Sequence, residues 1–438
     1  MSTKSLQKFI IEGGYKLSGD IIPAGNKNSV LPIICASALT DEPVFLENVP
    51  NILDVEILLQ IFEELGGKYK YTRDDGKLEL YPKGINRYTF SKELASKLRA
   101  SNLYISPLWA RFGKSIVPHP GGDYLGPREM TAHYEVFRKM GLNVLEKSGN
   151  IEISGKRCND NLYIHMYEPS VTATENAIMA SVIGNCITTV YGAACEPHVE
   201  ELCVFLKKMG ANIEGEGTNR ILIRGVEKLS GTVHKIWPDH IDVSTSIIIG
   251  AVTGGEIRIK GVRHEDLKTI LFFFESFNLK TKAEGEDLLV PANQELKVVD
   301  PIWSSIKGVY SQPWPGFPTD LMAPSIVLAT QAQGTTLFFE KMYSGRLYFA
   351  SFLNGMGANI ILCDPHRVVV NGKTKFMGQR LVAPDIRAGM AFLIAALIAE
   401  GESIVESIHH IDRGYPIIEK RLQKLGAKIQ RVNEDCSS

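Results

Sequence analysis

Two kinds of helical pattern alternate along most of the chain, separated by short runs rich in β-branched and aromatic residues. One kind is apolar almost throughout, which predicts helices buried on all sides. The longest uninterrupted apolar run, 389–399, is too short to span a bilayer, so it too predicts a buried helix. These apolar segments are 29–39 (SVLPIICASAL), 175–184 (ENAIMASVIG), 244–254 (STSIIIGAVTG), 323–332 (APSIVLATQA) and 389–401 (GMAFLIAALIAEG).

The second kind is an amphipathic helix that ends at a glycine or asparagine and leads into a β-rich run. That residue can adopt the left-handed conformation that commonly terminates a helix. The pattern occurs six times, at intervals of 68 to 79 residues, as EELGGKY, RKMGLNV, KKMGANI, ESFNLKT, NGMGANI and QKLGAKI, with the terminating residues Gly66, Gly141, Gly210, Asn278, Gly357 and Gly426. We therefore predict six repeat units, each with a buried helix, an amphipathic helix and several strands.

Six such units could form a solenoid or two lobes of three. We prefer two lobes, because 225–244 (GVEKLSGTVHKIWPDHIDVS) follows the third unit and reads as a linker. The predicted N-terminal lobe is 27–239 and carries a glycine-rich loop at 119–129. The predicted C-terminal lobe is 240–438 together with 1–26, whose strand FIIEGG is expected to pair with it. The fold class is α/β, with six βαβαββ-type units.

Composition narrows the range of partners. The chain has 438 residues, of which 44% are hydrophobic and 22% charged, and its formal net charge is −1. No overall field recruits nucleic acid or an anionic membrane, although a local group of arginines could bind a small anion. Seven scattered cysteines without CxxC spacing favour a reducing cytoplasm, and the first residues lack an apolar signal region.

Two N-terminal motifs contain candidate functional residues. In AGNKNSVLPII, we expect Asn28 to cap a helix that starts at Ser29, with Lys27 just outside it, which would make an anion site. A capped helix beside a solvated lysine is the alternative. In LRAS and PGGDYLGPRE, Arg99, Asp123 and Arg128 surround a loop that could act as a lid, or that could be a plain surface turn.

Three C-terminal motifs add charged residues. In FPTD, Asp320 precedes an apolar helix, where it could be a helix cap or a reactive carboxylate. DIRAG contains Asp385 and Arg387, and HIDRGY contains Arg413. The chain has no Walker loop, no complete dinucleotide fingerprint and no HExxH helix, so we expect no metal and no cofactor.

Taken together, GNKNSVLPI, LRAS, PGGDYLGPR, FPTD, DIRA and HIDRGY resemble, in this order, the enolpyruvyl transferase family. The resemblance covers nearly the whole chain. It is to the UDP-N-acetylglucosamine branch, because the 5-enolpyruvylshikimate-3-phosphate branch would show a GSKS-type start and a GNAGTA-type segment. It implies two lobes, each an inside-out α/β barrel of three repeats with the helices packed inward, in agreement with the sixfold repeat.

The resemblance also implies an activity, the transfer of the enolpyruvyl group from phosphoenolpyruvate to the 3′-hydroxyl of UDP-N-acetylglucosamine, a step in peptidoglycan precursor synthesis. It implies a monomer in the cytoplasm with these two substrates, no cofactor and no metal. By the same resemblance, Asp320 would accept the hydroxyl proton and Asp123 would be the general acid. The positions around phosphoenolpyruvate would be Lys27, Arg128, Arg346, Arg387 and Arg413, and those of the nucleotide-sugar side Asn28, Arg99, Ser170 and Val171, with Asp385 a further substrate-binding position.

The chain departs from the family pattern at four positions. Asp123 stands where the usual member has a cysteine, which predicts resistance to fosfomycin. Glu168 replaces a lysine, Thr131 an aspartate and Glu129 a proline. These changes leave open another nucleotide or nucleotide sugar as acceptor. A non-catalytic binding paralogue is the other alternative, against which the presence of Lys27, Asp320, Arg387 and Arg413 argues.

Overall fold

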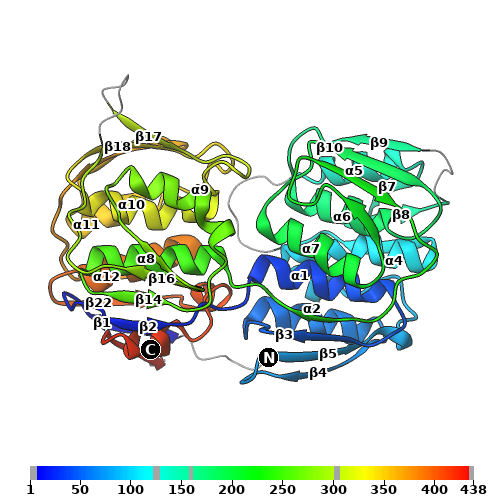
Figure 1. The fold of residues 1–438 in the computed structure, drawn as a ribbon, viewed down its shortest axis with the longest axis horizontal. Helices are drawn as coiled ribbons and strands as arrows, with labels where there is room; N and C mark the ends of the chain where they lie inside the picture. The colour runs from blue at the N-terminus through cyan, green and yellow to red at the C-terminus, as the bar shows by residue number, and fades with distance from the viewer. Residues whose placement is uncertain (1–6, 122–128, 157–160, 300–305, 434–438) are drawn as a thin grey trace. The chain divides into compact units, whose positions relative to one another are not determined.

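The computed structural model describes residues 7–121, 129–156, 161–299 and 306–433 (Figure 1). These residues fall into two compact units. The N-terminal unit contains the described residues from Gly25 to Trp237, and the C-terminal unit contains those up to Ala24 and from Pro238 onward. From the sequence, we expected these two boundaries after residues 26 and 239, two residues later in each case.

The described residues form six sheets, three in each unit. The sheets of the C-terminal unit have the strand orders β2(Gly19–Ile21)-β14(Ile257–Ile259)-β16(Asp287–Val290)-β15(Lys282–Glu284), β17(Lys307–Tyr310)-β18(Gly334–Phe339)-β20(Arg367–Gly372)-β19(Ile360–Asp364) and β21(Arg380–Val382)-β22(Glu402–Glu406)-β1(Gln7–Glu12)-β23(Lys428–Asn433). Those of the N-terminal unit are β13(Val233–Lys235)-β3(Val44–Glu47)-β5(Lys77–Tyr81)-β4(Lys68–Thr72), β9(Leu162–His165)-β10(Ile187–Tyr191)-β12(Arg220–Arg224)-β11(Asn212–Glu214) and β6(Lys114–Pro118)-β8(Asn150–Ser154)-β7(Asn143–Lys147).

All six sheets share one pairing pattern, a parallel pair followed by two antiparallel pairs. In the first sheet of the C-terminal unit, β14 pairs parallel with β2 and antiparallel with β16, and β15 then pairs antiparallel with β16. In the three-stranded sheet, a parallel bridge between Thr89 and Ile116 takes the place of the first strand. The sixfold repeat of the sequence is therefore a repeat of topology.

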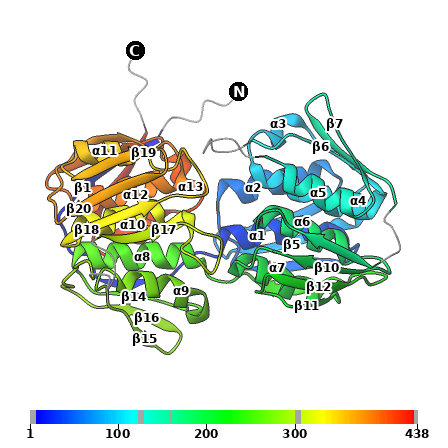
Figure 2. The ribbon, with the colours of Figure 1, turned by 90° about the horizontal axis from the view of Figure 1, so that it is seen from above.

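In each unit, the apolar helices lie inside the sheets, as Figures 1 and 2 show. In the C-terminal unit, α8 (His240–Thr253) and α12 (Ile386–Ile398) both pack against α10 (Met322–Gln331), and nearly every residue of the three is buried. In the N-terminal unit, the inner helices are α1 (Lys27–Ala36), α4 (Ile105–Phe112) and α6 (Val171–Ser181). The predicted apolar helices and the predicted fold class are confirmed.

The amphipathic helices end where the sequence predicts. They are α2 (Leu53–Glu64), α5 (Thr131–Lys139), α7 (Pro197–Lys208), α9 (His264–Glu275), α11 (Ala350–Gly355) and α14 (Ile418–Lys424). The glycine or asparagine that follows each has a positive φ, with values of 107°, 81°, 103°, 55°, 111° and 97° for Gly66, Gly141, Gly210, Asn278, Gly357 and Gly426. This is the backbone conformation that ends a helix and redirects the chain.

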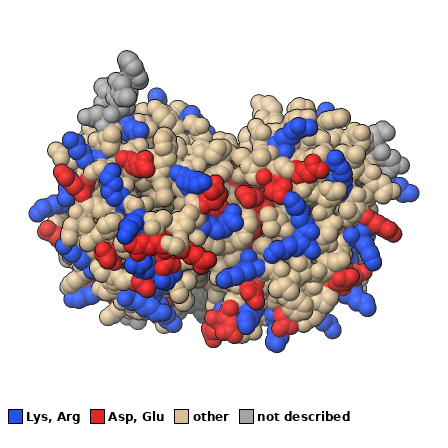
Figure 3. All heavy atoms as spheres, in the orientation of Figure 1, with Lys and Arg blue, Asp and Glu red and all other residues tan. Residues whose placement is uncertain are grey.

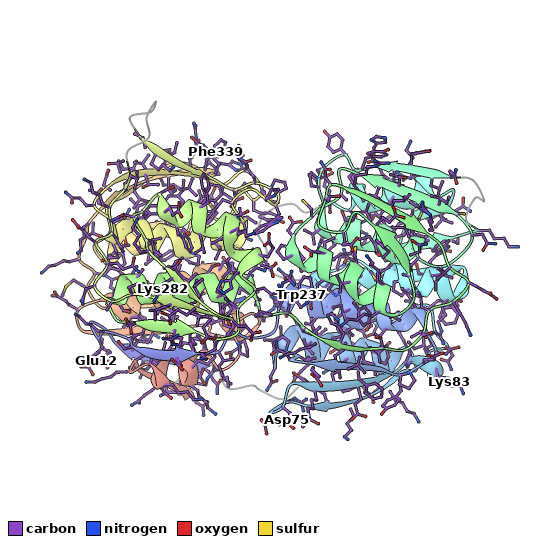
Figure 4. All side chains as sticks on the ribbon, viewed as in Figure 1. Glu12, Asp75, Lys83, Trp237, Lys282 and Phe339 are labelled. Atoms are coloured by element: carbon purple, nitrogen blue, oxygen red, sulfur yellow. The ribbon has the colours of Figure 1, made fainter. Side chains whose placement is uncertain are left out.

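The described residues pass from one unit to the other between Ala24 and Gly25 and again between Trp237 and Pro238, and a strand precedes each passage. β2 precedes α1 in the sequence yet belongs to a sheet of the C-terminal unit, and β13 precedes α8 yet belongs to the N-terminal unit. At the crossings, Asp239 donates a backbone hydrogen bond of 2.8 Å to Ala24, and Asn26 one of 2.7 Å to Trp237, which is labelled in Figure 4. The first four residues of FIIEGG, 9–12, lie in β1, between β22 and β23.

Charged side chains of both signs are interspersed over the face in Figure 3, as the net charge of −1 leads one to expect. None of the helices formed by the described residues is both long and apolar enough to cross a membrane.

Candidate active site

The C-terminal unit brings together one carboxylate and two arginines that are far apart in the sequence. Arg387 donates from Nη2 to Oδ2 of Asp320 at 2.5 Å, and Arg346 donates from Nη1 to Oδ1 of Asp320 at 3.0 Å. The side chains of Arg346 and Arg387 are only 4% and 8% exposed, whereas a quarter of the Asp320 side chain is exposed. We call these three residues the carboxylate–arginine cluster. It is a concentrated positive site with one reachable carboxylate.

Electrostatics keep this carboxylate ionised. Burial raises the pKa of Asp320, but the charges of Arg387 and Arg346 and the hydrogen bonds they donate outweigh burial, so the pKa lies well below its ordinary value. Burial lowers the pKa of Arg387, but Asp320 and neighbouring groups outweigh burial and raise the pKa above its ordinary value. In addition, the buried Nε of Arg346 has no hydrogen-bond partner among the described residues. Such a donor is suited to bind an anionic ligand.

Asp320 is not a helix cap, so that alternative is wrong. It lies in the 3₁₀ turn η4 (Thr319–Leu321) just before α10, and neither element has a side-chain cap. Its two oxygens pair with arginines that come 26 and 67 positions later. Asp385, in contrast, does cap α12, where its Oδ1 accepts hydrogen bonds from the backbone of Arg387 at 2.8 Å and of Ala388 at 3.1 Å. This cap fixes the start of the helix that presents Arg387.

The HIDRGY segment is anchored on both sides of Arg413. The phenol oxygen of Tyr415 accepts a hydrogen bond of 3.1 Å from Nη1 of Arg387 and lies 3.1 Å from the Thr245 hydroxyl. On the other side, Asp412 accepts two hydrogen bonds, of 2.7 and 2.8 Å, from Arg431 of β23. Arg413, the C-cap residue that follows the short helix α13 (His409–Asp412), therefore lies between two anchored positions of the chain.

A buried histidine also belongs to the surroundings of the cluster. His240 is the first residue of α8 and stacks edge-on against Trp314 at 5.8 Å. Burial lowers the pKa of His240 to about 4, although the negative charges of Asp266 and Asp320 oppose this effect. The sequence analysis missed His240 because it lies in the segment that was read as a linker.

The N-terminal unit places Lys27 inside the protein. Its Nζ lies 2.8 Å from Oδ2 of Asp54, and their side chains are 10% and 1% exposed. The alternative of a solvated lysine is therefore wrong. The cap was also assigned to the wrong asparagine, because Asn26, not Asn28, accepts hydrogen bonds from the backbone of residues 28 and 29, at 2.9 and 3.3 Å. The helix thus begins at Lys27, and Asn28 is half-buried in its first turn.

Three of the expected nucleotide-side residues, Arg99, Ser170 and Val171, lie at the starts of two other helices. Arg99 donates from Nη2 to the backbone oxygen of Glu129 at 3.3 Å, just before α5. Ser170 caps α6, accepting a hydrogen bond of 3.4 Å from Ala173, and Val171 is the first residue of that helix. A capped helix start without acidic residues in its first turn favours anions.

A buried histidine links these two helix starts. Nε2 of His133 in α5 lies 2.9 Å from the hydroxyl of Thr172 in α6 and 3.3 Å from Nδ2 of Asn102. Two of the departures from the family pattern are also in contact, since Thr131 donates a hydrogen bond of 3.0 Å to Oε2 of Glu129. A carboxylate therefore remains beside position 131, although it is supplied by residue 129.

Two of the predicted residues, Asp123 and Arg128, lie outside the described residues. In the described part of the chain, no three His, Cys, Asp or Glu side chains gather as metal ligands would. Two buried acidic residues were not expected from the sequence. Asp54 is the partner of Lys27, and Glu340 is the partner of Thr319. Each is an acidic residue whose partner comes from a distant segment, so neither leaves a local pattern.

Comparison with known proteins agrees with this geometry. Residues 11–422 match the family model described as EPSP synthase (3-phosphoshikimate 1-carboxyvinyltransferase). The chain belongs to this family of enolpyruvyl transferases. It is therefore a transferase.

Relatives of similar length carry a more specific name. A protein of Bradyrhizobium diazoefficiens named UDP-N-acetylglucosamine 1-carboxyvinyltransferase is 44% identical over 427 residues, covering 98% of both chains. A protein of the same name from Treponema denticola is 42% identical over 426 residues, covering 97% of this chain and 99% of its own.

Solved structures of other enolpyruvyl transferases have the same fold as this chain. The enolpyruvyl transferase NikO from Streptomyces tendae has a TM-score of 0.87 at 23% identity, covering 98% of this chain and all of its own. An EPSP synthase from Acinetobacter baumannii has a TM-score of 0.73 at 17% identity, covering 97% of this chain.

Proposed function

We propose that this enzyme transfers the enolpyruvyl group of phosphoenolpyruvate to the 3′-hydroxyl of UDP-N-acetylglucosamine and releases phosphate. The carboxylate–arginine cluster is the observation that carries this proposal, because it combines an ionised carboxylate with a site for a small anion. The relatives named for this acceptor, at 42% to 44% identity over nearly the full length, support the choice of acceptor. The reaction would begin peptidoglycan precursor synthesis and so serve the cell wall.

In the first half of the reaction, the 3′-oxygen of the sugar bonds to C2 of phosphoenolpyruvate. Asp320 takes the hydroxyl proton, and C3 receives a proton from a general acid, for which Asp123 is the candidate by resemblance. In the second half, C3 returns a proton to the conjugate base of the general acid, the double bond forms again and the bond between C2 and the phosphate oxygen breaks. The phosphate leaves with that electron pair and takes up the proton held by Asp320, so protons and electrons balance.

Asp320 must become more basic before it can act. In the structure, Arg346 and Arg387 hold its pKa far below neutrality, which makes it a weak base. The phosphate and carboxylate of phosphoenolpyruvate compete for the same guanidinium groups, which favour bidentate contacts with such anions. When the arginines turn to the substrate, Asp320 loses part of its charge compensation and its pKa rises. Substrate binding and activation of the base are thereby coupled.

The family resemblance implies two further cations around phosphoenolpyruvate. Arg413 follows α13 as its C-cap residue, and Lys27 lies in the first turn of α1, where the helix start adds positive potential. These side chains offset the charge of phosphoenolpyruvate, so the proposed chemistry needs neither a metal nor a cofactor. The scattered cysteines support a place in the cytoplasm, and we propose that the enzyme acts as a monomer.

The proposal is tested by phosphate release from phosphoenolpyruvate with a panel of UDP-sugars and free nucleotides, with each product identified by its mass. We expect release with UDP-N-acetylglucosamine and a product heavier by one enolpyruvyl group. Release only with another acceptor would reassign the substrate. Binding of phosphoenolpyruvate without release, whatever the acceptor, would favour the non-catalytic alternative.

A further inference from the structure

Glu340 is a fully buried carboxylate at the end of β18, directly after Phe339, which is labelled in Figure 4. Both of its oxygens are used. Oε2 accepts a hydrogen bond of 2.7 Å from the Thr319 hydroxyl. Oε1 accepts hydrogen bonds from the Ser311 hydroxyl at 2.8 Å and from the backbone of Met342 and Tyr343 at 2.8 and 3.2 Å.

One side of this carboxylate holds the segment that bears the proposed base. Thr319 directly precedes Asp320, and its backbone oxygen accepts a hydrogen bond of 2.9 Å from Nη1 of Arg346. The same guanidinium nitrogen contacts Oδ1 of Asp320 at 3.0 Å. A shift of Thr319 would therefore displace Asp320 and alter two contacts of Arg346 together.

The other side of the carboxylate holds the turn that leads to Arg346. The backbone of Arg346 donates a hydrogen bond of 3.3 Å to the oxygen of Tyr343, and its guanidinium lies 5.1 Å from the centre of the Tyr343 ring. Glu340 fixes the backbone of Met342 and Tyr343 through Oε1. The two segments that carry Asp320 and Arg346 thus meet at a single side chain that lies outside the carboxylate–arginine cluster.

We propose that Glu340 is a positioning residue that sets the placement of Asp320 relative to Arg346. This inference rests on the proposed function, because it assigns Asp320 to proton transfer and Arg346 to binding of phosphoenolpyruvate. A displacement of about 1 Å at reacting groups can cost on the order of 10²-fold in rate. Glu340 therefore acts on the reaction without touching a substrate.

Four variants separate positioning from simple structural support. Glu340→Ala removes the whole link, and Thr319→Val removes only its bond to the side of the base. Glu340→Gln keeps it, because the amide oxygen can accept from the backbone of residues 342 and 343 while the amide nitrogen donates to the Thr319 hydroxyl. Thr253→Val is the matched control, since Thr253 is also half-buried, lies in the same unit and donates a hydrogen bond of 2.7 Å to Ile249 within α8.

We expect Glu340→Ala and Thr319→Val to lower kcat and to raise KM for phosphoenolpyruvate, each by about tenfold or more, with KM for the acceptor within about twofold. Glu340→Gln should retain most of the activity. Thr253→Val should match Thr319→Val in thermal midpoint but keep the kinetic constants of the native enzyme. Crystal structures of Glu340→Ala and Thr319→Val should show a changed distance between Asp320 and Arg346.

The inference is overturned if Thr319→Val and Glu340→Ala lower only the melting temperature while kcat and KM per folded enzyme stay unchanged. An unaltered Asp320–Arg346 pair in the crystal structure of Glu340→Ala would also overturn it. Phosphate release by the native enzyme is measured in the same assay and judges the proposed function separately. If the native enzyme releases none, the crystal structures alone decide the role of Glu340.

Discussion

Arg387 and Asp320 are joined by a hydrogen bond of 2.5 Å although they are 67 positions apart in the sequence. This contact makes one cation serve two purposes, since Arg387 neutralises the carboxylate in the free enzyme and is also a proposed ligand of phosphoenolpyruvate. The two arginines keep Asp320 ionised but weakly basic. Its pKa rises only when an anion competes for these arginines. The following predictions examine this arrangement and its counterparts in the N-terminal unit.

Asp320→Asn should lower turnover by about 10² to 10⁴, the usual cost of removing a general base. The amide cannot accept the hydroxyl proton, although it still fits between the two arginines. Asp364→Asn is the control, because Asp364 forms an exposed ion pair of 2.6 Å with Arg367 in the same unit. Rates of phosphate release under saturating substrates provide the comparison. Turnover of the Asp320 variant within a factor of a few of the native rate would remove Asp320 from the mechanism.

The buried pair of Lys27 and Asp54 should be worth far more than a surface pair. Asp54→Asn removes the charge that offsets Lys27, at a cost of about 3 to 5 kcal/mol for a buried ion pair. The double variant with Lys27→Met should recover part of this loss, because no buried charge then remains at either position. Unfolding followed by calorimetry in a double-mutant cycle measures the coupling. As a control, Glu93→Gln breaks the exposed pair with Lys97 and should leave the midpoint unchanged. Additive effects of the Lys27 and Asp54 changes would show that the pair is not coupled.

His133 should make stability depend on pH. Burial, aided by the charge of Arg99, lowers the pKa of His133 to about 3, below its ordinary value of 6.5. As the pH falls below 6.5, the unfolded chain takes up a proton here and the folded protein does not. This residue therefore stabilises the protein above that pH, and its contribution is lost between pH 6.5 and about 3, by at most about 1.4 kcal/mol per pH unit.

The measurement compares the pH dependence of the unfolding midpoint in the native protein and in His133→Gln, which keeps a partner for Thr172. We expect the variant to lose less stability on acidification than the native protein does. Parallel curves for the two proteins would mean that His133 titrates alike in the folded and unfolded states.

Glu168 should weaken binding of a diphosphate-containing acceptor. It is exposed, and its backbone oxygen accepts a hydrogen bond of 2.7 Å from Ser170, the cap of α6. A carboxylate there opposes the positive potential of the helix start. Glu168→Lys should therefore lower KM for UDP-N-acetylglucosamine severalfold without changing kcat, with a greater effect at low salt. An unchanged KM at low salt would place the diphosphate away from this segment.

Asp123 should protect the enzyme from fosfomycin. The drug inactivates the usual family member by alkylation of a lid cysteine thiolate, and a carboxylate is a far poorer nucleophile toward the epoxide. Asp123→Cys should remain active, because both side chains can donate a proton, and should become sensitive. Time-dependent inactivation and intact mass after incubation with drug and acceptor test this, in a Cys363→Ser background that removes an exposed thiol. An adduct on the native protein, or an active Asp123→Cys variant that stays unmodified, would contradict the alignment of this loop.

Local patterns predicted the fold because its signals are local. The terminating residues from Gly66 to Gly426 recur after each amphipathic helix, and all six have the positive φ that ends a helix. The sequence could not choose between Asn26 and Asn28 as the cap of α1, because both are good caps and the choice depends on the backbone conformation. The repeat can therefore be predicted from the sequence, whereas the first and last residues of its helices cannot.

The candidate site was only partly predictable for the opposite reason. The motifs identified Asp320 and Arg387, and the family resemblance added Arg346, but the pairing of Asp320 with two arginines joins segments 26 and 67 positions apart. Glu340 and Asp54 were missed because their contacts are buried and involve residues from other segments of the chain. An isolated acidic residue near the start of a helix or the end of a strand gives no sign of such a contact.

The placement of β1 has a consequence for the order in which the protein is made. This strand is synthesised before the other described strands, yet its neighbours β22 and β23 are the last two of them, and Gln7 pairs with Asn433. The N-terminal unit is nearly continuous in the chain and is fully synthesised by Trp237, whereas the other unit must wait for its final strand. A nascent chain therefore carries β1 without its sheet for almost the whole of translation. The same register places Gln7 opposite Asn433, so a peptide that links the chain next to these two residues would let new termini be opened elsewhere.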